Sequence, residues 1–134
     1  MNELEFLKQN DIIFLAVDNN EARRVMQEFC AENKIPLVNG GINGFFGTAY
    51  VYVPDKTACL DCAGLTEKES GKVFSVSSTA GITGALQSEL GIKLLTGQDE
   101  AVAGILHIYD SAQIHKLKIK PQENCGICGV NKNV

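Results

Sequence analysis

The sequence predicts an α/β fold with a mixed sheet, in which a βαβ unit is followed by antiparallel strands. Three observations support this prediction. A continuous apolar run is followed by an amphipathic helical pattern and then by a second short apolar run, which is the order of a βαβ unit. Alternating apolar and polar residues recur in three later segments, as in strands with one wet face. Two Cys-x-x-Cys pairs, far apart in the chain, indicate a site of four thiolates.

The composition is that of a single domain over residues 1–134. Hydrophobic residues make up 45% and charged residues 21% of the chain, close to the average of globular proteins. The net charge of −4 argues against nonspecific binding to nucleic acid. No apolar run approaches the roughly 18 residues of a membrane span, and the N-terminal residues have no apolar signal core. We therefore expect a cytoplasmic protein that binds neither nucleic acid nor a membrane.

The first part of the chain predicts the βαβ unit. Residues 11–17 have the pattern of a strand buried on both faces, and residues 18–20 are good helix-capping residues. A helix follows over 21–33, with apolar side chains at helical spacing, and 35–38 predicts the second strand. The glycine-rich segment 40–47 predicts a turn between two strands, because no helix follows it as a phosphate loop would require.

The second part of the chain predicts the antiparallel strands. The run at 48–53 is the first of them, and 63–79 is polar and without periodicity, which predicts a mobile loop. A helix over 80–95 carries Ile82, Leu86, Leu90, Lys93 and Leu94 near one stripe, with Gly97 as its C-cap. Residues 101–109 and 113–119 predict two further strands around a turn. Together, these elements predict a partial Rossmann-like mixed sheet, and no linker in the sequence would separate two domains.

Four of the five cysteines predict a metal site. They are Cys59, Cys62, Cys125 and Cys128. A Cys-x-x-Cys turn places two thiolates about one tetrahedral edge apart, and Zn²⁺ prefers four such ligands. The two pairs are too far apart for a self-contained finger, so we expect a closed structural zinc site that ties the C-terminal segment to the middle of the chain. The alternatives are a thioredoxin-like redox pair, which normally opens a helix after the first strand, and four unrelated thiols.

The fifth cysteine, Cys30, lies in the predicted helix 21–33. The favoured interpretation is a buried free thiol that acts as a small apolar side chain. A nucleophilic role is the alternative, and Arg23 and Arg24 are the nearby residues that would lower the pKa of such a thiol.

Five short motifs follow one another between residues 8 and 129. Each motif alone is weak, but the order of the five is specific. The motifs are the apolar strand leading to Asp18-Asn19 and Arg23, the segment from Ile35 to Gly41, the first Cys-x-x-Cys pair, the segment from Leu86 to Gly97, and the closing Cys125–Gly129. In this order they resemble the second half of the ThiF/MoeB/HesA family, which are adenylyltransferases related to ubiquitin-activating enzymes.

The resemblance implies the C-terminal portion of a ThiF-type adenylyltransferase. Members of the family bind Mg-ATP and adenylate the C-terminal glycine of a ubiquitin-like sulfur-carrier protein, and they are commonly homodimers. Asp18 matches the family's aspartate that assists with Mg-ATP, and Arg23 belongs to the same motif. A carboxylate at the carboxyl end of a parallel strand also faces the crevice in which α/β sheets bind ligands. The alternative is that Asp18 only caps the helix that follows it.

The sequence departs from the family pattern in three respects. The family's Gly-rich nucleotide loop and phosphate-binding cations lie upstream of this segment, and neither GxGxxG nor GxxxxGK[ST] is present in the chain. Gln27 stands where the family usually has Asn, and no cysteine between Cys62 and Cys125 matches the loop nucleophile of some relatives. From these departures we expect the chain alone to be a poor enzyme, and we expect Mg-ATP binding to need the family's upstream nucleotide loop.

Two hypotheses follow from the resemblance and the departures. The first is an adenylyltransferase portion that works only with an N-terminal half, which could be a separate chain. The second is a non-catalytic, zinc-stabilised module that dimerises or binds a ubiquitin-like protein. Under either hypothesis, an uncovered edge at the strand 11–17 predicts a homodimer, because proteins cover exposed apolar edges.

Overall fold

The computed structural model describes residues 3–68 and 71–129 of the chain. They form one five-stranded sheet, whose strands lie side by side in chain order. The first two strands are parallel and every later pair of neighbours is antiparallel, so the predicted mixed α/β sheet is confirmed. The strands are β1 (Ile13–Leu15), β2 (Leu37–Asn43), β3 (Phe46–Tyr52), β4 (Ile105–Asp110) and β5 (Gln113–Lys118).

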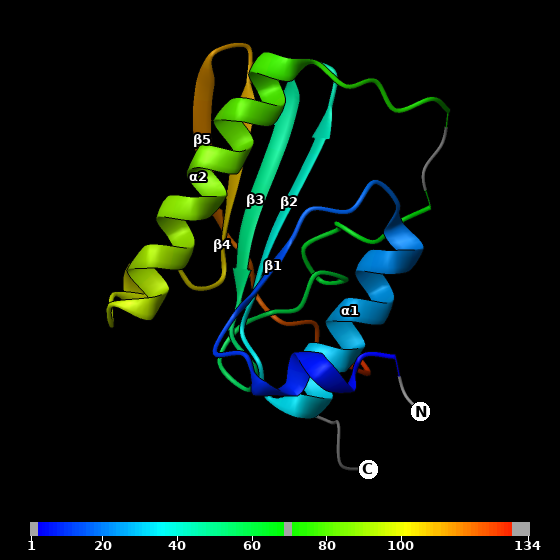
Figure 1. The fold of residues 1–134 in the computed structure, drawn as a ribbon, viewed down its shortest axis with the longest axis vertical. Coiled ribbons are helices and arrows are strands. Elements are labelled where there is room, and N and C mark those ends of the chain that lie inside the picture. The colour runs from blue at the N-terminus through cyan, green and yellow to red at the C-terminus, as the bar shows by residue number, and fades with distance from the viewer. Residues whose placement is uncertain (1–2, 69–70, 130–134) are drawn as a thin grey trace.

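The two long helices lie on opposite faces of the sheet (Figure 1). α1 (Asn20–Asn33) connects β1 to β2, and α2 (Ser77–Leu95) lies across β2 and β3 on the other face. Two short helices, η1 (Glu5–Gln9) and α3 (Asp99–Val102), precede β1 and β4. Among the described residues, no helix is both long and apolar enough to cross a membrane.

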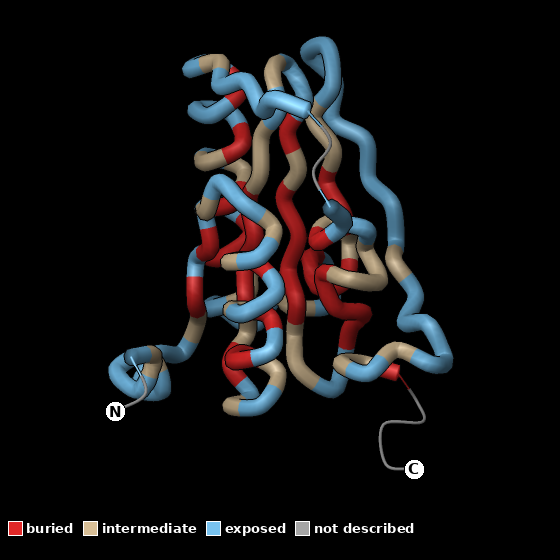
Figure 2. Tube along the Cα trace, turned by 90° about the vertical axis from the view of Figure 1, so that its right-hand side faces the viewer, coloured by how far each residue is buried: buried red, intermediate tan, exposed pale blue. Residues whose placement is uncertain are grey.

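Strand alternation divides the core into two clusters. Leu37 and Tyr52 belong to the cluster on the α1 side, together with Phe29 of that helix. Val38 packs in the other cluster, with Leu90 of α2. Successive residues of a strand point to opposite faces of the sheet, so neighbours in the sequence belong to different clusters. Buried residues follow the central strands of the sheet (Figure 2).

β1 is less buried than the sequence predicts. Ile13 and Leu15 are buried, but Phe14 between them is 48% exposed, so the prediction of a strand buried on both faces was wrong. The reason is the place of β1, which is one of the two edge strands of the sheet among the described residues. The Phe14 ring meets α2 at Gly91, where an added Cβ would clash with it, and the rest of the ring is uncovered at the sheet edge.

The glycine-rich segment also differs from its prediction. Gly40 and Gly41 lie inside β2 and pair with β3, whereas the turn is confined to Gly44 and Phe45. Gly44 has a φ of +60°, which a glycine adopts without steric strain. The glycines at 40 and 41 are therefore not turn residues. They leave room for two side chains, Gln87 at Gly40 and Arg23 at Gly41.

α2 begins at Ser77, before the predicted residue 80, and its sheet-facing side combines part of the predicted stripe with polar residues. Leu90 is buried, and Leu86 and Leu94 pack against the same core cluster. The buried residues of α2 also include Thr79, Thr83 and Gln87, whereas Ile82 is exposed. The polar residues face β2 and β3 at glycines, where the sheet leaves room for them. Gly97 follows the helix with a φ of +81°, as its predicted place at the C-terminus requires.

The segments that precede α2 and β4 were predicted as a loop and as part of a strand. The described part of the predicted loop 63–79 has no helix or strand before Ser77, apart from an isolated bridge between Gly44 and Ser75. Residues 69–70 of this segment lie outside the described residues, and its mobility stays a prediction. The predicted strand 101–109 begins only at Ile105, because α3 occupies its first positions and Gly104 turns the chain with a φ of +71°.

Candidate functional site

The two Cys-x-x-Cys pairs converge at one point. The four Sγ atoms lie within 4.8 Å of one another. Cys59 Sγ is 3.5 Å from Cys125 Sγ, and Cys62 Sγ is 3.5 Å from Cys128 Sγ. Four thiolates around Zn²⁺, each at ~2.3 Å, would be about 3.8 Å apart, so the four residues fit a tetrahedral metal ion. The predicted meeting of these four cysteines is confirmed.

Burial and hydrogen bonds from backbone amides shift the pKa values of thiols in this site. The Cys59 amide donates to Cys128 Sγ at 3.2 Å, and the Gln122 amide donates to Cys62 Sγ at 3.4 Å. Burial raises the pKa of the Cys59 thiol. Burial also acts to raise the pKa of Cys125, but the amides of Cys128 and Ile127 bring it down to about 7. A metal must therefore displace a proton from Cys59, which makes metal binding pH-dependent.

Gln27, which departs from the family's usual Asn, connects α1 to the first cysteine pair. Its Oε1 accepts a hydrogen bond from the Leu60 amide at 2.8 Å, and its side chain is fully buried. Gly129 follows the second cysteine pair, and its amide donates a hydrogen bond to the Cys125 carbonyl at 2.9 Å. Only glycine fits at this position, because an added Cβ would be 2.5 Å from that carbonyl oxygen. Both residues hold the ligand-bearing turns in place.

Cys30 lies outside the metal site and is fully buried. Burial raises the pKa of its thiol to about 12. The guanidinium of Arg23 donates to the Val17 carbonyl, and that of Arg24 donates to the Thr66 carbonyl. These contacts favour the interpretation of Cys30 as a small apolar core residue over a nucleophilic role.

We expect Cys30 to resist alkylation by iodoacetamide at pH 8 in the folded, metal-loaded protein. With a pKa of about 12, only about one thiol in ten thousand is ionised at that pH, and the sulfur is out of reach of the reagent. Mass spectrometry of tryptic peptides should show modification of Cys30 only after a denaturant is added. Rapid modification without denaturant would contradict the assignment of Cys30 to the core.

A second candidate site lies at the carboxyl ends of β1 and β2. A cavity of about 550 Å³ opens there between α1 and α2. Its walls come from the end of β1, from Gly40–Ile42 of β2, from Arg23 of α1 and from the sheet-facing side of α2. The segment 73–75, called the strap below, closes one side, because Phe74 is hydrogen-bonded through its backbone to Asn43 and Gly44. This is the crevice in which open α/β sheets bind ligands.

Asp18 lies on the wall of this cavity and its side chain is not the helix cap. The cap of α1 is Asn19, whose Oδ1 accepts from the Ala22 amide at 2.8 Å. Asp18 is exposed, and its Oδ1 accepts a hydrogen bond from Asn19 Nδ2 at 3.1 Å. The alternative in which Asp18 serves only as a helix cap was therefore wrong.

Arg23 is buried in the same wall and is held by the chain around it. Its Nε donates to Asn39 Oδ1 at 3.2 Å and its Nη2 donates to the Val17 carbonyl at 2.8 Å, while Nη1 contacts Asn20. An added Cβ at Gly41 would lie 3.0 Å from Nη2, so the glycine leaves room for the guanidinium. The site thus brings Asp18 and Arg23 to one cavity, as the sequence predicts.

Two polar residues of α2 that line the cavity were missed by the sequence predictions. Thr83 and Gln87 are buried against the sheet, and Gln87 bonds to both β1 and β2. Their spacing of four residues, continued from Thr79, places three polar side chains on one helix face. The predicted stripe was defined by apolar residues such as Leu86, so the polar residues on the neighbouring face of the helix were not included in it.

The chain is similar in sequence to one family of known proteins. The model of the ThiF family matches residues 1–129. The chain belongs to the ThiF family. The chain is 30% identical over 136 residues to SAMP-activating enzyme E1 of Haloferax volcanii, which covers 96% of this chain and 50% of that relative. It is 28% identical over 142 residues to adenylyltransferase and sulfurtransferase MOCS3 of Aedes aegypti, covering 99% of this chain and 32% of the relative. This ThiF-family chain thus spans half or less of the length of these relatives.

Solved structures show the same fold. The crystal structure of MccB from E. coli matches 96% of this ThiF-family chain with a TM-score of 0.79, at 18% identity and over 42% of its own length. A crystal structure of E. coli MccB with ATP matches 94% of the chain with a TM-score of 0.75. The predicted membership of the ThiF family and the predicted fold class are therefore confirmed.

Proposed function

We propose that this chain is the C-terminal portion of a ThiF-type adenylyltransferase that acts with Mg-ATP on the C-terminus of a ubiquitin-like sulfur-carrier protein. The observation that carries the proposal is the cavity at the carboxyl ends of β1 and β2, with Asp18 on its wall. The names of the relatives, which include an adenylyltransferase and sulfurtransferase and an activating enzyme E1, support this reaction class.

In the proposed reaction, the carboxylate of the carrier's C-terminal glycine attacks the α-phosphorus of ATP, and pyrophosphate leaves. Asp18 is the residue that would hold the magnesium ion of Mg-ATP, because carboxylate oxygens are the ligands that Mg²⁺ prefers. The wall formed by Gly40 and Gly41 is covered by the side chains of Gln87 and Arg23, because an added Cβ at either glycine would meet one of them. Arg23 adds positive charge to the same wall.

We propose that an N-terminal half, in the same chain or a separate one, completes the nucleotide site. Transfer to the α-phosphorus requires cations that neutralise the phosphoryl oxygens. Arg23 is the one cation among the described residues that line the cavity, and its Nε, Nη1 and Nη2 all contact oxygen atoms of the chain itself. Further cations would therefore have to come from elsewhere.

Exchange of labelled pyrophosphate into ATP tests this function. We expect exchange when a ubiquitin-like carrier with a free C-terminal glycine and the N-terminal half are both present, and none with a carrier that lacks its last residue. If exchange never depends on the carrier, the non-catalytic, zinc-stabilised module is the better description of the chain. Calorimetry with Mg-ATP then shows whether that module binds the nucleotide.

We propose that the four thiolates hold zinc as a structural ion. A tetrathiolate set with four protein ligands leaves no open position at which the metal could activate water or substrate. Cysteines that bind a metal as thiolates must stay reduced, which is typical of a reducing compartment and supports the expectation of a cytoplasmic protein. The same reasoning favours a metal site over a redox pair, because all four sulfurs face one point.

We propose a homodimer formed through the outer face of α2. This face carries an exposed stripe that changes from small to large residues along the helix, and we call it the outer stripe. The outer stripe consists of Gly81, Ala85, Ser88, Ile92 and Leu95. The spacing of four and three residues is that of a helix–helix seam. In an antiparallel pair, Ile92 and Leu95 of one copy would face Ala85 and Gly81 of the other.

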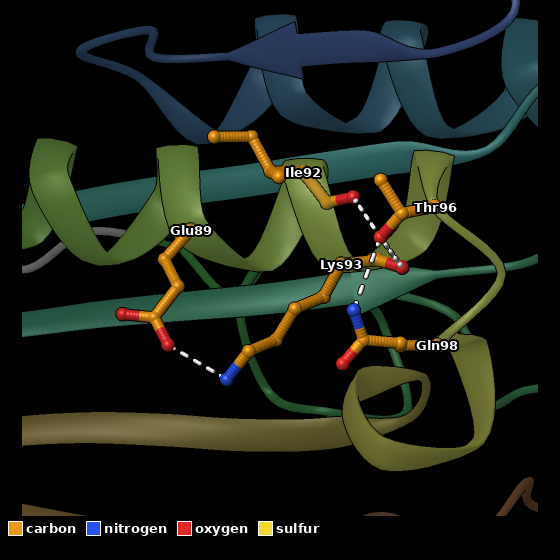
Figure 3. Close-up of polar contacts among 5 residues, drawn as sticks. All are labelled: Glu89, Ile92, Lys93, Thr96 and Gln98. Carbon is orange, nitrogen blue, oxygen red and sulfur yellow. Dashed lines mark hydrogen bonds and ion pairs between the residues drawn. The ribbon is translucent and has the colours of Figure 1, made fainter.

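The flanks of the outer stripe favour this pairing. Glu89 and Lys93 form an ion pair of 2.7 Å along α2, and Figure 3 shows this pair together with the hydrogen bonds that end the helix at Thr96. The two charges neutralise each other within one copy, so two copies can approach without net repulsion at this face. The exposed side chains of Ile92 and Leu95 are 61% and 55% accessible in the single chain.

We expect Ile92→Glu to convert the dimer to a monomer. The substitution places a charge opposite the small half of the partner helix, where it would be buried without a counter-ion. Sedimentation equilibrium measures the change in mass. Val25→Glu is the matched control, because Val25 is an exposed apolar residue of α1 on the other face of the sheet. A wild-type protein that stays monomeric at high concentration would contradict the proposal.

A further inference from the structure

The amide of Gln87 joins the ends of two strands at the cavity. Its Nε2 donates to the Leu15 carbonyl of β1 at 2.9 Å and to the Val38 carbonyl of β2 at 2.8 Å. A primary amide has two hydrogens, and each is directed at a different strand. The side chain is 6% exposed, so water does not compete freely for these bonds.

Gly40 gives Gln87 the space to reach this position. A Cβ at residue 40 would lie 2.8 Å from the Gln87 carboxamide carbon and closer still to its Oε1. Since an approach below 3.0 Å is essentially never seen for a real Cβ, any other residue at 40 would displace the amide. The glycine of β2 and the glutamine of α2 are therefore parts of one arrangement.

Arg23 makes the corresponding contact from the opposite face of the sheet. Its Nη2 donates to the Val17 carbonyl, whereas Gln87 donates to the Leu15 carbonyl. These two carbonyls flank Ala16, and Asp18 follows directly. The segment that leads into Asp18 is thus held by one side chain from each long helix, although β1 itself contains only three residues.

We propose that Gln87 is a positioning residue, which fixes the carboxyl end of β1 against β2 and thereby sets the place of the Asp18 carboxylate. The consequence for Mg-ATP rests on the function proposed above. A displacement of a reacting or ligand group by about 1 Å can reduce turnover about a hundredfold. Gln87 itself has no direct part in the chemistry, because its donors are directed at the two strands.

Hydrogen exchange measures this positioning without a nucleotide. In the full chain with its metal, we expect Gln87→Met to raise the exchange rate of the β1 amides at 13–15, which pair with β2, by about tenfold, because two buried hydrogen bonds to the strand ends are lost. Peptides from β4 and β5 should exchange as in the wild type. Gln98→Met is the matched control, since Gln98 is an exposed glutamine whose amide bonds only to Thr96 in the described residues. An unchanged rate at 13–15, or an equal rise in all peptides, would overturn the proposal.

A double substitution distinguishes positioning from a general loss of stability. Gly40→Ala should by itself raise the exchange at 13–15 as Gln87→Met does, because the methyl group displaces the amide. In a Gln87→Ala background the same Gly40→Ala change should have little further effect, since the amide is already gone. Fully additive effects would show that the glycine and the glutamine act independently and would count against the proposal.

The affinity for ATP with and without Mg²⁺ tests the consequence for Asp18. In the protein completed by its N-terminal half, Asp18→Asn should remove the magnesium-dependent gain in affinity, and Gln87→Met should reduce that gain about tenfold. The double variant should bind no more weakly than Asp18→Asn alone. A gain that Gln87→Met leaves intact would overturn the positioning role. If the wild type shows no such gain, the proposed function fails, and the exchange measurements alone decide on Gln87.

Discussion

Cys125→Ser should lower the melting temperature of the metal-loaded protein by at least about 10 °C, as expected for a loss of roughly 3 kcal/mol or more from a domain of this size. The metal is the main connection between two distant parts of the chain. After β5, the described C-terminal segment is held by the bond from the Ile119 amide to the Gly104 carbonyl, by packing of Ile119 and Ile127 against the core, and by contacts at the cysteines. The four thiolates are therefore the main polar attachment of this segment to the middle of the chain.

The zinc content and the thiol count check this prediction. Elemental analysis under reducing conditions should give one zinc per chain, and a chelator should reproduce the lower melting temperature of Cys125→Ser. Cys30→Ser is the control, because Cys30 lies outside the metal site and its replacement should leave the zinc content unchanged. Thiol titration should detect the four ligand cysteines only after chelation. A content well below one zinc per chain would contradict the site, and thiols that react equally before and after chelation would favour the redox alternative.

Asp18→Asn should reduce carrier-dependent pyrophosphate exchange by about a hundredfold or more in the protein completed by its N-terminal half. The neutral amide has lost the negative charge that binds Mg²⁺, and groups that stabilise developing charge typically contribute factors of this size. The fold should be unaffected, because Asp18 is exposed and the cap of α1 is provided by Asn19. The melting temperature should therefore stay within about 2 °C of the wild type.

Asp55→Asn is the matched control for this substitution. Asp55 lies outside the residues that line the cavity, and its φ of +64° is one that Asn also accepts. It should keep full exchange activity. The isolated chain should show exchange near background, with or without Asp18. Robust exchange by the isolated chain that Asp18→Asn abolishes would show that no further cations are needed, and would contradict the proposed role of the N-terminal half.

The features that were predicted from the sequence depend on local patterns. The βαβ unit follows from one apolar run, one helical period and capping residues close together in the chain. The metal site follows from ligand spacing, because a Cys-x-x-Cys turn already places two sulfurs near each other. Asp18 was predicted for the cavity since the carboxyl end of a parallel strand has a fixed place in such folds.

The features that were not predicted depend on contacts between distant segments. The buried face of α2 includes polar residues because Thr83 and Gln87 meet Gly47 and Gly40, and no pattern within the helix reveals those glycines. Gln27 bonds to the Leu60 amide, more than thirty residues away in the chain. Phe14 is partly exposed because no strand lies beyond β1 among the described residues. The order of the strands in the sheet decides this, and the apolar run itself does not reveal that order.

The strap has a consequence for the speed at which the cavity can open and close. The chain between Cys62 and α2 is fixed at one end by the metal-binding cysteines and near the other by the backbone bonds of Phe74 to Asn43 and Gly44. If those backbone bonds break, the strap cannot diffuse away, since both flanking segments stay anchored. A tether of about ten residues recloses in roughly 10–100 ns, far faster than a typical turnover. The carbonyls of Thr66 and Glu67 accept hydrogen bonds from Arg24 and Asn20 of α1, so this part of the tether stays attached to α1 even when the metal is released.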